Sequence, residues 1–149
     1  MRFLTKFALA LLLPGFVPAE PYPLLATVSY TGAEGAAWSE CPSPYVIDGD
    51  TIRCGAERVR LLGIDAPELH GCPRYRRCAG GDPVASRLSL RQALSTGPVR
   101  YRIIKRDRYG RAVAVVSAGV LNLSCWQIRQ GRADYVARWD DGRIIAQSC

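Results

Sequence analysis

Two acidic segments, close together in the chain, hold the side chains best suited to chemistry. The first is the tight turn Asp48-Gly49-Asp50-Thr51, and the second is Asp65-Ala66-Pro67-Glu68. Carboxylates are the hard oxygen ligands that Ca²⁺ prefers in proteins. A cation held by such groups polarises a phosphoryl group and lowers the pKa of a water molecule. These residues therefore indicate a site for metal-assisted hydrolysis.

Two arginines accompany these acids. Arg60 lies just before the second acidic segment, and Arg111 follows the turn Asp107-Arg108-Tyr109-Gly110. A guanidinium group matches a phosphate in two-point contacts, which an ammonium group cannot do. Acids that hold a cation, together with arginines that clamp a phosphate, indicate hydrolysis of phosphodiesters.

The expected strands would bring these residues together. Residues 45–47 and 51–54 flank the first acidic turn, which predicts a β-hairpin with a carboxylate on each side of its tip. Residues 58–64 form the next predicted strand, which carries Arg60. Because Pro67 stops that strand, it delivers Asp65 and Glu68 to its own end.

A helix is predicted after the third strand. Asp82 suits the N-cap and Pro83 the first helical position, and the helix would continue to Leu94, before Gly97-Pro98. We expect its buried face to contain Val84, Leu88 and Leu94, with Ala85 nearby.

A second, short helix is predicted near the end of the chain. Ser124 followed by Gln127 matches a capping box, and Gly131 suits the C-terminal cap after Gln130. Residues 132–149 leave two alternatives open, because Asp141-Gly142 suits either a hairpin or the start of a brief last helix.

Two further strands, over residues 99–105 and 111–116, complete the pattern. Five strands with a helix after the third predict an α+β fold, a five-stranded OB-type β-barrel with two or three helices packed on it. We assign residues 41–149 to this domain. Residues 20–40 are expected to form an extended or mobile lead-in, with an edge strand around Val28 and Tyr30.

The chain has 149 residues, which is enough for one domain with a core but not for two. Its formal net charge is +7, and all its basic residues except Lys6 and Lys105 are arginines. This charge is compatible with a polyanionic partner such as nucleic acid, and equally with a surface that only improves solubility.

Residues 1–19 are typical of a secretory signal peptide. A charged start with Arg2 and Lys6 precedes an apolar run, and small residues precede a cleavage site at Glu20. An uncleaved anchor is the alternative, although the run is too short to span a bilayer. We expect a secreted or periplasmic protein, monomeric and without stable membrane association once the signal is removed.

Six cysteines, an even number in a chain with a predicted signal, indicate a disulfide framework. Of the 15 connectivities that six cysteines allow, we favour the pairs nearest in sequence. A zinc site is the alternative, but the chain has no C-x-x-C pair and only one histidine, His70. The expected pairs are Cys41–Cys54, Cys72–Cys78 and Cys125–Cys149.

Three motifs in this order resemble the thermonuclease family, the staphylococcal-nuclease-like proteins. They are the acidic turn within residues 46–52, the strand and acidic end at residues 58–68, and Asp107-Arg108-Tyr109-Gly110-Arg111. The resemblance extends over about residues 45–133. It implies an OB-type barrel and calcium-dependent cleavage of DNA and RNA with little base preference, leaving a 3′-phosphate.

The resemblance also implies a role for each matching residue. Asp50, Asp65 and the backbone carbonyl of Ala66 would bind Ca²⁺, and Asp48 would hold water in the outer shell. Glu68 would orient or deprotonate the attacking water. The phosphate clamps would be Arg60 and Arg111, and the substrate contacts would be Tyr109 and Arg108.

Some side chains have two interpretations. Tyr135 and Trp139 could stack on bases or pack in the core, and the Arg74, Arg76 and Arg77 cluster could contact phosphates or stay in solvent. Two alternatives to a nuclease also stay open. One is a non-catalytic module that binds nucleic acid, and the other is an envelope domain that binds another protein.

Overall fold

The computed structural model describes residues 37–149. The expected signal peptide and the expected strand around Val28 and Tyr30 lie outside the described residues. Within the described part, no helix is long and apolar enough to pass through a membrane.

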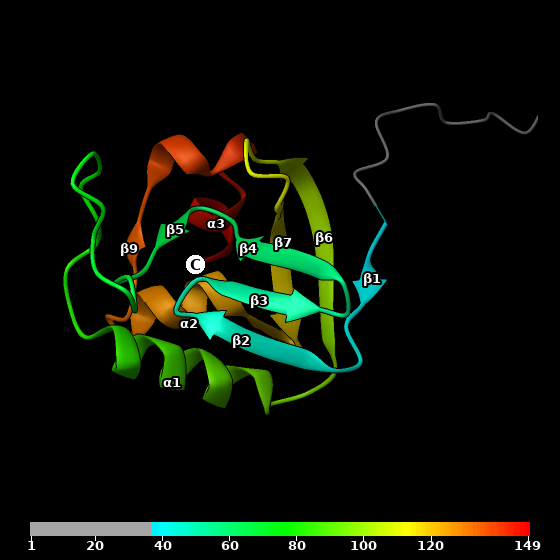
Figure 1. Ribbon diagram of the computed structural model, residues 1–149. Coiled ribbons are helices and arrows are strands. Elements are labelled where there is room, and N and C mark those ends of the chain that lie inside the picture. Colours follow the sequence, from blue (N-terminus) through cyan, green and yellow to red (C-terminus); the bar gives the residue numbers. More distant parts are fainter. Residues whose placement is uncertain (1–36) are drawn as a thin grey trace, which may run out of the picture. The chain divides into compact units, whose positions relative to one another are not determined.

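A mixed seven-stranded sheet curls into a half-barrel (Figure 1). The OB-like α+β fold is therefore confirmed. The main strands run in the order β6-β7-β4-β3-β2, and β4 and β7 pair in parallel. The five predicted strands correspond to β2 (Pro44–Asp48), β3 (Thr51–Cys54), β4 (Glu57–Leu61), β6 (Val99–Arg106) and β7 (Ala112–Ala118). The strand predicted over residues 58–64 is wrong at its end, because a turn at Leu62-Gly63, where Gly63 has a φ of 73°, stops β4 before the acidic segment.

Short strands add to this framework. Next to β6 lies β1 (Ser39–Glu40), so the end of the expected lead-in is part of the sheet, and β8 (Leu121–Asn122) pairs with β7. A separate two-stranded ribbon joins β5 (Ile64–Asp65) to β9 (Asp134–Tyr135). This ribbon ties Asp65 to the C-terminal part of the chain.

Alternation along the strands separates the core from the site. Val59 and Leu61 on β4 lie in the barrel core with Ile52 on β3. Because successive side chains of a strand point to opposite faces, Arg58 and Arg60 emerge on the other side of β4. The core therefore fixes the strand that carries the proposed phosphate clamp.

Helix α1 (Pro83–Leu94) begins as predicted, since the Asp82 carboxylate accepts hydrogen bonds from the first-turn amides. Its predicted buried face is wrong in part. Val84 and Leu88 are 56% and 53% exposed, whereas the buried residues are Ser86, Leu90 and Ala93; Leu94 is half-buried against the core.

The reason for this difference is a close approach between α1 and the β2–β3 turn. A Cβ atom on Gly49 would lie 2.0 Å from Ser86 Oγ, so only a small residue on each side allows the contact. Small side chains, rather than the large apolar ones, therefore decide which face of α1 is buried. Figure 1 shows α1 running beside β2.

Helix α2 (Leu123–Arg129) starts two residues earlier than predicted. Its N-cap is Asn122, whose side chain accepts hydrogen bonds from the amides of Ser124 and Cys125. The predicted capping box is therefore wrong. Ser124 Oγ donates instead to the carbonyl of Leu62, and the buried amide of Gln127 donates to the carbonyls of Gly49 and Ser86.

The end of α2 is as predicted. Gly131 has a φ of 62° and its amide donates to the carbonyl of Ile128, while the amide of Arg132 donates to the carbonyl of Gln127. These two bonds form a Schellman motif, which needs the positive φ that glycine adopts easily.

The three expected disulfides are all present, Cys41–Cys54, Cys72–Cys78 and Cys125–Cys149. Since every cysteine in the described residues is paired, no thiol there is available to zinc. The zinc alternative is therefore discarded, and the third bond fastens the end of the chain to α2.

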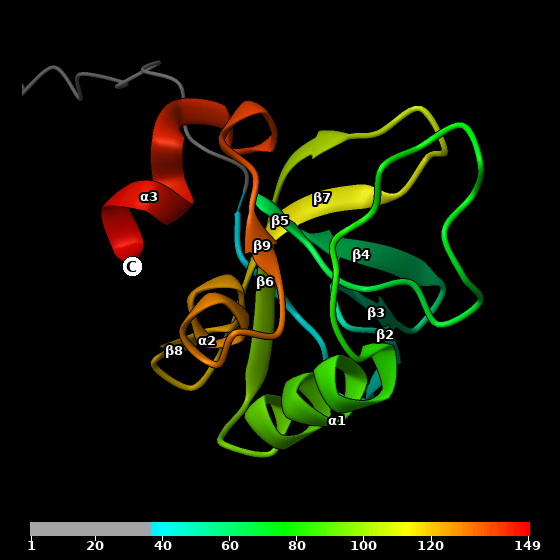
Figure 2. The ribbon, with the colours of Figure 1, turned by 90° about the vertical axis from the view of Figure 1, so that its left-hand side faces the viewer.

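The C-terminal segment forms a brief last helix and not a hairpin at Asp141-Gly142. Two 3-10 turns, η1 (Ala137–Trp139) and η2 (Asp141–Arg143), lead into the short helix α3 (Ile144–Ser148). In Figures 1 and 2, α3 lies well apart from α1. Ile145 of this segment packs on Leu62, Val113 and Val115. These four residues form a second, small hydrophobic core outside the barrel.

Asp140 holds this segment together. Its buried carboxylate accepts hydrogen bonds from the amides of Ile145 and Ala146 and from the hydroxyl of Tyr135. Burial acts to raise the pKa of Asp140, but these donors outweigh it and hold the pKa below its usual value. The carboxylate therefore stabilises the fold when ionised.

We expect Asp140→Ala to lower the free energy of unfolding by about 2 kcal/mol at pH 7, because three donors lose a charged acceptor. A carboxyl group with a lowered pKa stabilises the fold above its unfolded pKa, and this contribution disappears as the pH falls through the folded pKa. The difference between wild type and variant should therefore shrink below about pH 4. Urea denaturation of the oxidised proteins measures this.

The control is Asp141→Ala, which removes a half-exposed carboxylate paired with Lys105. We expect this change to cost less than about 1 kcal/mol. A loss for Asp140→Ala that is equal at pH 7 and near pH 2 would contradict the assigned role of the ionised carboxylate.

Candidate active site

The buried acid Asp50 is the centre of the site. It is 3% exposed, and its carboxylate accepts hydrogen bonds from Thr51 Oγ1 at 2.8 Å, Arg60 Nη1 at 3.0 Å and the amide of Ala66 at 3.1 Å. The hairpin tip is thereby joined to the end of β4 and to β5.

Asp65 meets the same guanidinium group. Its Oδ1 atom accepts a hydrogen bond from Arg60 Nη2 at 2.9 Å, and its Oδ2 atom accepts one from the amide of Ala79 at 3.2 Å. Arg60 Nη2 also lies 2.8 Å from Asp50 Oδ2. Arg60 therefore bridges the two carboxylates, which lie close together as the sequence predicted.

Burial dominates the electrostatics of Asp50. It raises the pKa of Asp50 to about 6 against the lowering effect of Arg60, and the nearby charge of Asp48 contributes to this rise. Asp48 adjoins it directly, since the amide of Asp50 donates to Asp48 Oδ1 at 3.2 Å. Additional positive charge at this point would be favourable.

Arg76 supplies such a charge. Its Nη2 atom lies 2.6 Å from Asp65 Oδ1 and 2.9 Å from Glu68 Oε1, which links the predicted catalytic acid to the cluster. Neither sequence interpretation of Arg76, a phosphate contact or a solvated loop residue, describes this position. The one signal in the sequence was the bracketing Cys72–Cys78 pair, which says that the loop is closed but not that it folds over a strand end.

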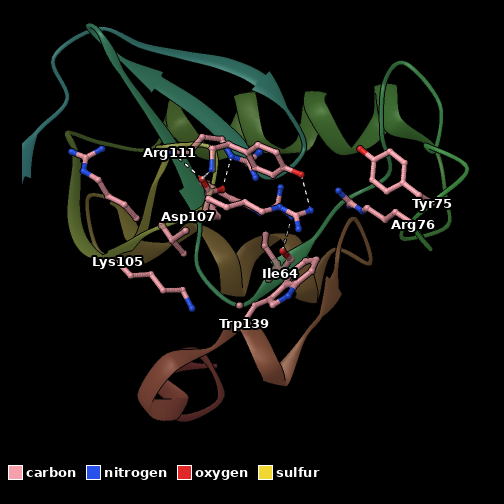
Figure 3. A pocket seen from close by; sticks show the side chains of 14 residues that line it. Ile64, Tyr75, Arg76, Lys105, Asp107, Arg111 and Trp139 are labelled. Carbon is pink, nitrogen blue, oxygen red and sulfur yellow. Dashed lines mark hydrogen bonds and ion pairs between the residues drawn. The ribbon is translucent and has the colours of Figure 1, made fainter.

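A cavity of about 530 Å³ adjoins the cluster (Figure 3). Arg111 is held there by Asp107, whose Oδ2 atom accepts a hydrogen bond from Arg111 Nε at 2.7 Å. The sequence placed Asp107 only in a turn, and its role in fixing Arg111 was missed. The cationic and aromatic side chains that line the cavity are Arg60, Tyr75, Arg76, Lys105, Arg106, Arg108, Tyr109, Arg111 and Trp139.

Aromatic rings fix three of these guanidinium groups. Arg60 lies over the ring of Trp139, with Cζ 5.2 Å from its centroid, and Arg108 and Arg111 lie 4.8 Å and 5.3 Å from the ring of Tyr109. Stacking of this kind is favourable and restricts the side chains. Trp139 therefore lines the cavity rather than the core.

Tyr135 and His70 lie away from this cavity. Tyr135 is outside this cavity, and its hydroxyl donates to Asp140. His70, the one histidine of the chain, is exposed. The structure thus gathers Asp48, Asp50, Arg60, Asp65, Ala66 and Glu68 into one cluster, and it places Arg108, Tyr109 and Arg111 on the cavity that Arg60 also lines.

These residues fit a calcium ion. No three His, Cys, Asp or Glu side chains within residues 37–149 lie close enough together to form a metal site by themselves. The expected ligand set, however, is two carboxylates and a carbonyl, and Ca²⁺ accepts such oxygen donors together with water. Burial raises the pKa of Asp50 even though Arg60 lies beside it, so a further cation bound at this point would favour the ionised carboxylate.

The chain is similar to known proteins. A family model described as "Staphylococcal nuclease homologue" matches residues 58–146. A protein of Rhizobium meliloti (strain 1021) named "Succinoglycan biosynthesis protein ExoI" is 38% identical over an alignment 116 residues long, which covers 74% of this chain and 59% of that protein. The chain thus spans less than two thirds of this relative.

Proposed function

Because the chain belongs to the staphylococcal nuclease homologue family, we propose that it is a nuclease that hydrolyses DNA and RNA without sequence specificity and requires Ca²⁺. The observation that carries the proposal is the convergence of Asp50 and Asp65 on Arg60, which lines the same cavity as Arg111. In this proposal the cluster would hold the cation and the adjoining cavity would bind the phosphate.

Asp50, Asp65 and the carbonyl of Ala66 would hold the calcium ion, with Asp48 behind them. When bound, calcium supplies positive charge to the phosphoryl group and lowers the pKa of the attacking water. Asp50 lies in the β2–β3 turn, whereas Asp65 and Ala66 lie at the end of β5. The hydrogen bond from the amide of Ala66 to Asp50 joins these two segments.

The remaining steps belong to the side chains of this chain. Glu68 takes a proton from the attacking water on its carboxylate. Arg60 and Arg111 bind the phosphoryl oxygens, where negative charge grows in the transition state. The bond from phosphorus to the 5′ oxygen breaks, the 5′ oxygen takes a proton from solvent and leaves as a hydroxyl group, and the other product keeps a 3′-phosphate.

Three disulfides support a location in an oxidising compartment, since such bonds persist outside the cytosol. We therefore propose a secreted or periplasmic, monomeric enzyme that acts on nucleic acid reaching that compartment.

The proposal is tested with purified, oxidised protein, incubated with DNA and with RNA in calcium or in a chelator. We expect both substrates to be cut in calcium only, with 3′-phosphate ends. If DNA is bound but not cut in calcium, a non-catalytic binding module is the correct interpretation. If neither occurs, a domain that binds another protein becomes the better one.

Two observations favour those alternatives. Arg76 engages Asp65 and Glu68, so a protein cation already neutralises part of the acid cluster, as in a module without metal. The printed name of the Rhizobium meliloti relative refers to succinoglycan biosynthesis and not to nucleic acid.

The variant Arg76→Gln tests whether the acid cluster binds calcium or only forms ion pairs with Arg76. We expect the calcium dissociation constant to fall about tenfold, equivalent to about 1.4 kcal/mol, because the ion no longer competes with the guanidinium group. Isothermal titration measures this, with Arg77→Gln as the control on the exposed side of the same loop. Equal affinity in wild type and Arg76→Gln would mean that calcium does not enter this cluster.

A further inference from the structure

A row of basic and aromatic side chains crosses the outer face of the sheet beside the cavity. The register pairs Tyr45 on β2 with Arg53 on β3, and Arg53 with Arg58 on β4. The neighbouring pairs Val46–Ile52 and Ile52–Val59 belong to the core. Since side chains alternate along strands, Tyr45, Arg53 and Arg58 share the outward face.

The row continues at both ends. Arg87 on α1 donates to the hydroxyl of Tyr45 at 3.1 Å and lies over its ring, with Cζ 5.9 Å from the centroid. At the other end, β4 and β7 run parallel and Val59 pairs with Ala112. Arg58 and Arg111, each one residue before these partners, are therefore neighbours. Arg111 lines the cavity. We name Arg53, Arg58, Arg87 and Tyr45 the arginine strip.

The arginine strip keeps an unfavourable arrangement in solvent. Arg53 and Arg58 are exposed and directly opposite each other, and like charges in that position destabilise a sheet. Neither residue, nor Arg87, forms an ion pair within residues 37–149. A polyanion laid across them would relieve this repulsion.

We propose that the arginine strip binds the part of a single-stranded nucleic acid that extends beyond the cavity. From β4 to β2 the strip crosses about 10 Å, the distance across three neighbouring strands. Proteins that bind single strands combine cations that follow the phosphates with aromatic rings on which bases stack. Tyr45, 55% exposed and held by Arg87, provides such a ring.

This inference extends the proposed function, because the bound strand would be the flanking part of the substrate. Its test needs no cleavage. Fluorescence anisotropy in chelator measures the binding of a labelled oligonucleotide of about 16 nucleotides and of one of about 4, the limits of typical sites. If the wild type binds the longer strand but never cuts it in calcium, the proposed function fails while the strip stands.

The test variant is Arg53→Ser with Arg58→Ser. We expect the longer oligonucleotide to bind about tenfold more weakly and the salt slope of its log affinity to fall by about 1.4, which corresponds to two phosphate contacts on a single strand. The shorter oligonucleotide, which the cavity alone can hold, should bind the variant and the wild type equally.

A matched control removes the same charge elsewhere. Arg129 and Arg132 are exposed on α2 and the turn that follows it, outside the strip. The double change to serine there should leave the salt slope unchanged. An equal loss in this control, or an unchanged slope in the strip variant, would overturn the proposal.

Arg58→Glu adds an independent readout. It places a negative side chain directly opposite Arg53. The midpoint of thermal unfolding should therefore be equal to or above that of the wild type, because an opposite-charge pair stabilises the sheet. Binding of the longer strand should weaken. Strong binding of the longer strand by this folded variant would contradict the strip. A strip that binds an acidic polysaccharide instead would show unchanged oligonucleotide affinity in every variant, which also overturns the assignment.

Discussion

Replacement of Glu68 by serine should lower kcat for DNA cleavage about a thousandfold, the usual contribution of a well-placed general base. The half-buried Glu68 carboxylate lies at the edge of the acid cluster, joined to it through Arg76. It can therefore reach a water beside the cluster without being one of the proposed calcium ligands. Calcium affinity, measured by titration, should change little.

Glu40→Ser is the matched control, because Glu40 is an exposed acid on β1. Its cleavage rate should equal that of the wild type. Wild-type turnover in Glu68→Ser would remove Glu68 from the mechanism. A loss of calcium binding in parallel with activity would instead make Glu68 a ligand.

Arg60→Lys should be similarly slow, with kcat reduced about a hundredfold or more. A lysine ammonium cannot reproduce the two-point contact with a phosphate, nor can it bridge Asp50 and Asp65 with the same geometry. Single-turnover cleavage measures this effect. Near-normal activity would contradict the phosphate clamp.

The same substitution should also destabilise the protein in the absence of metal. Lysine keeps the positive charge but not the geometry with which Arg60 bridges Asp50 and Asp65, which are both buried. Complete removal of one partner of a buried ion pair costs about 3 kcal/mol or more, so we expect a loss below that value. Because burial raises the pKa of Asp50 to about 6, its carboxyl group is neutral below that pH and needs less compensation. The loss should therefore grow as the pH rises above about 6, whereas Arg77→Lys, on the exposed loop, should show no such dependence.

The features that could be predicted from the sequence are those set by nearby residues. The strand predicted over residues 58–64 was expected to carry Arg60, and β4 carries it on the face opposite the core residues Val59 and Leu61. Asp82 and Gly131 were recognised as caps, because a cap depends on the first or last turn of one helix. The disulfides also followed from proximity along the chain.

The errors arose where distant segments decide the outcome. Asn122 and Ser124 can both cap a helix, and the bond of Ser124 to Leu62, far along the chain, leaves the cap to Asn122. The contact of Ser86 with Gly49 similarly selects the buried face of α1. Arg76 reaches the acids only because the loop folds back over the end of β5, and no local pattern encodes that path.

The decisive experiment is a crystal structure of the oxidised protein with calcium and a short nucleotide bearing a phosphate. We expect a calcium ion bound by Asp50, Asp65 and the carbonyl of Ala66, Arg76 released from Asp65, and the phosphate between Arg60 and Arg111. Calcium absent from the cluster at saturating concentration, with Arg76 still paired to Asp65 and Glu68, would contradict the proposal.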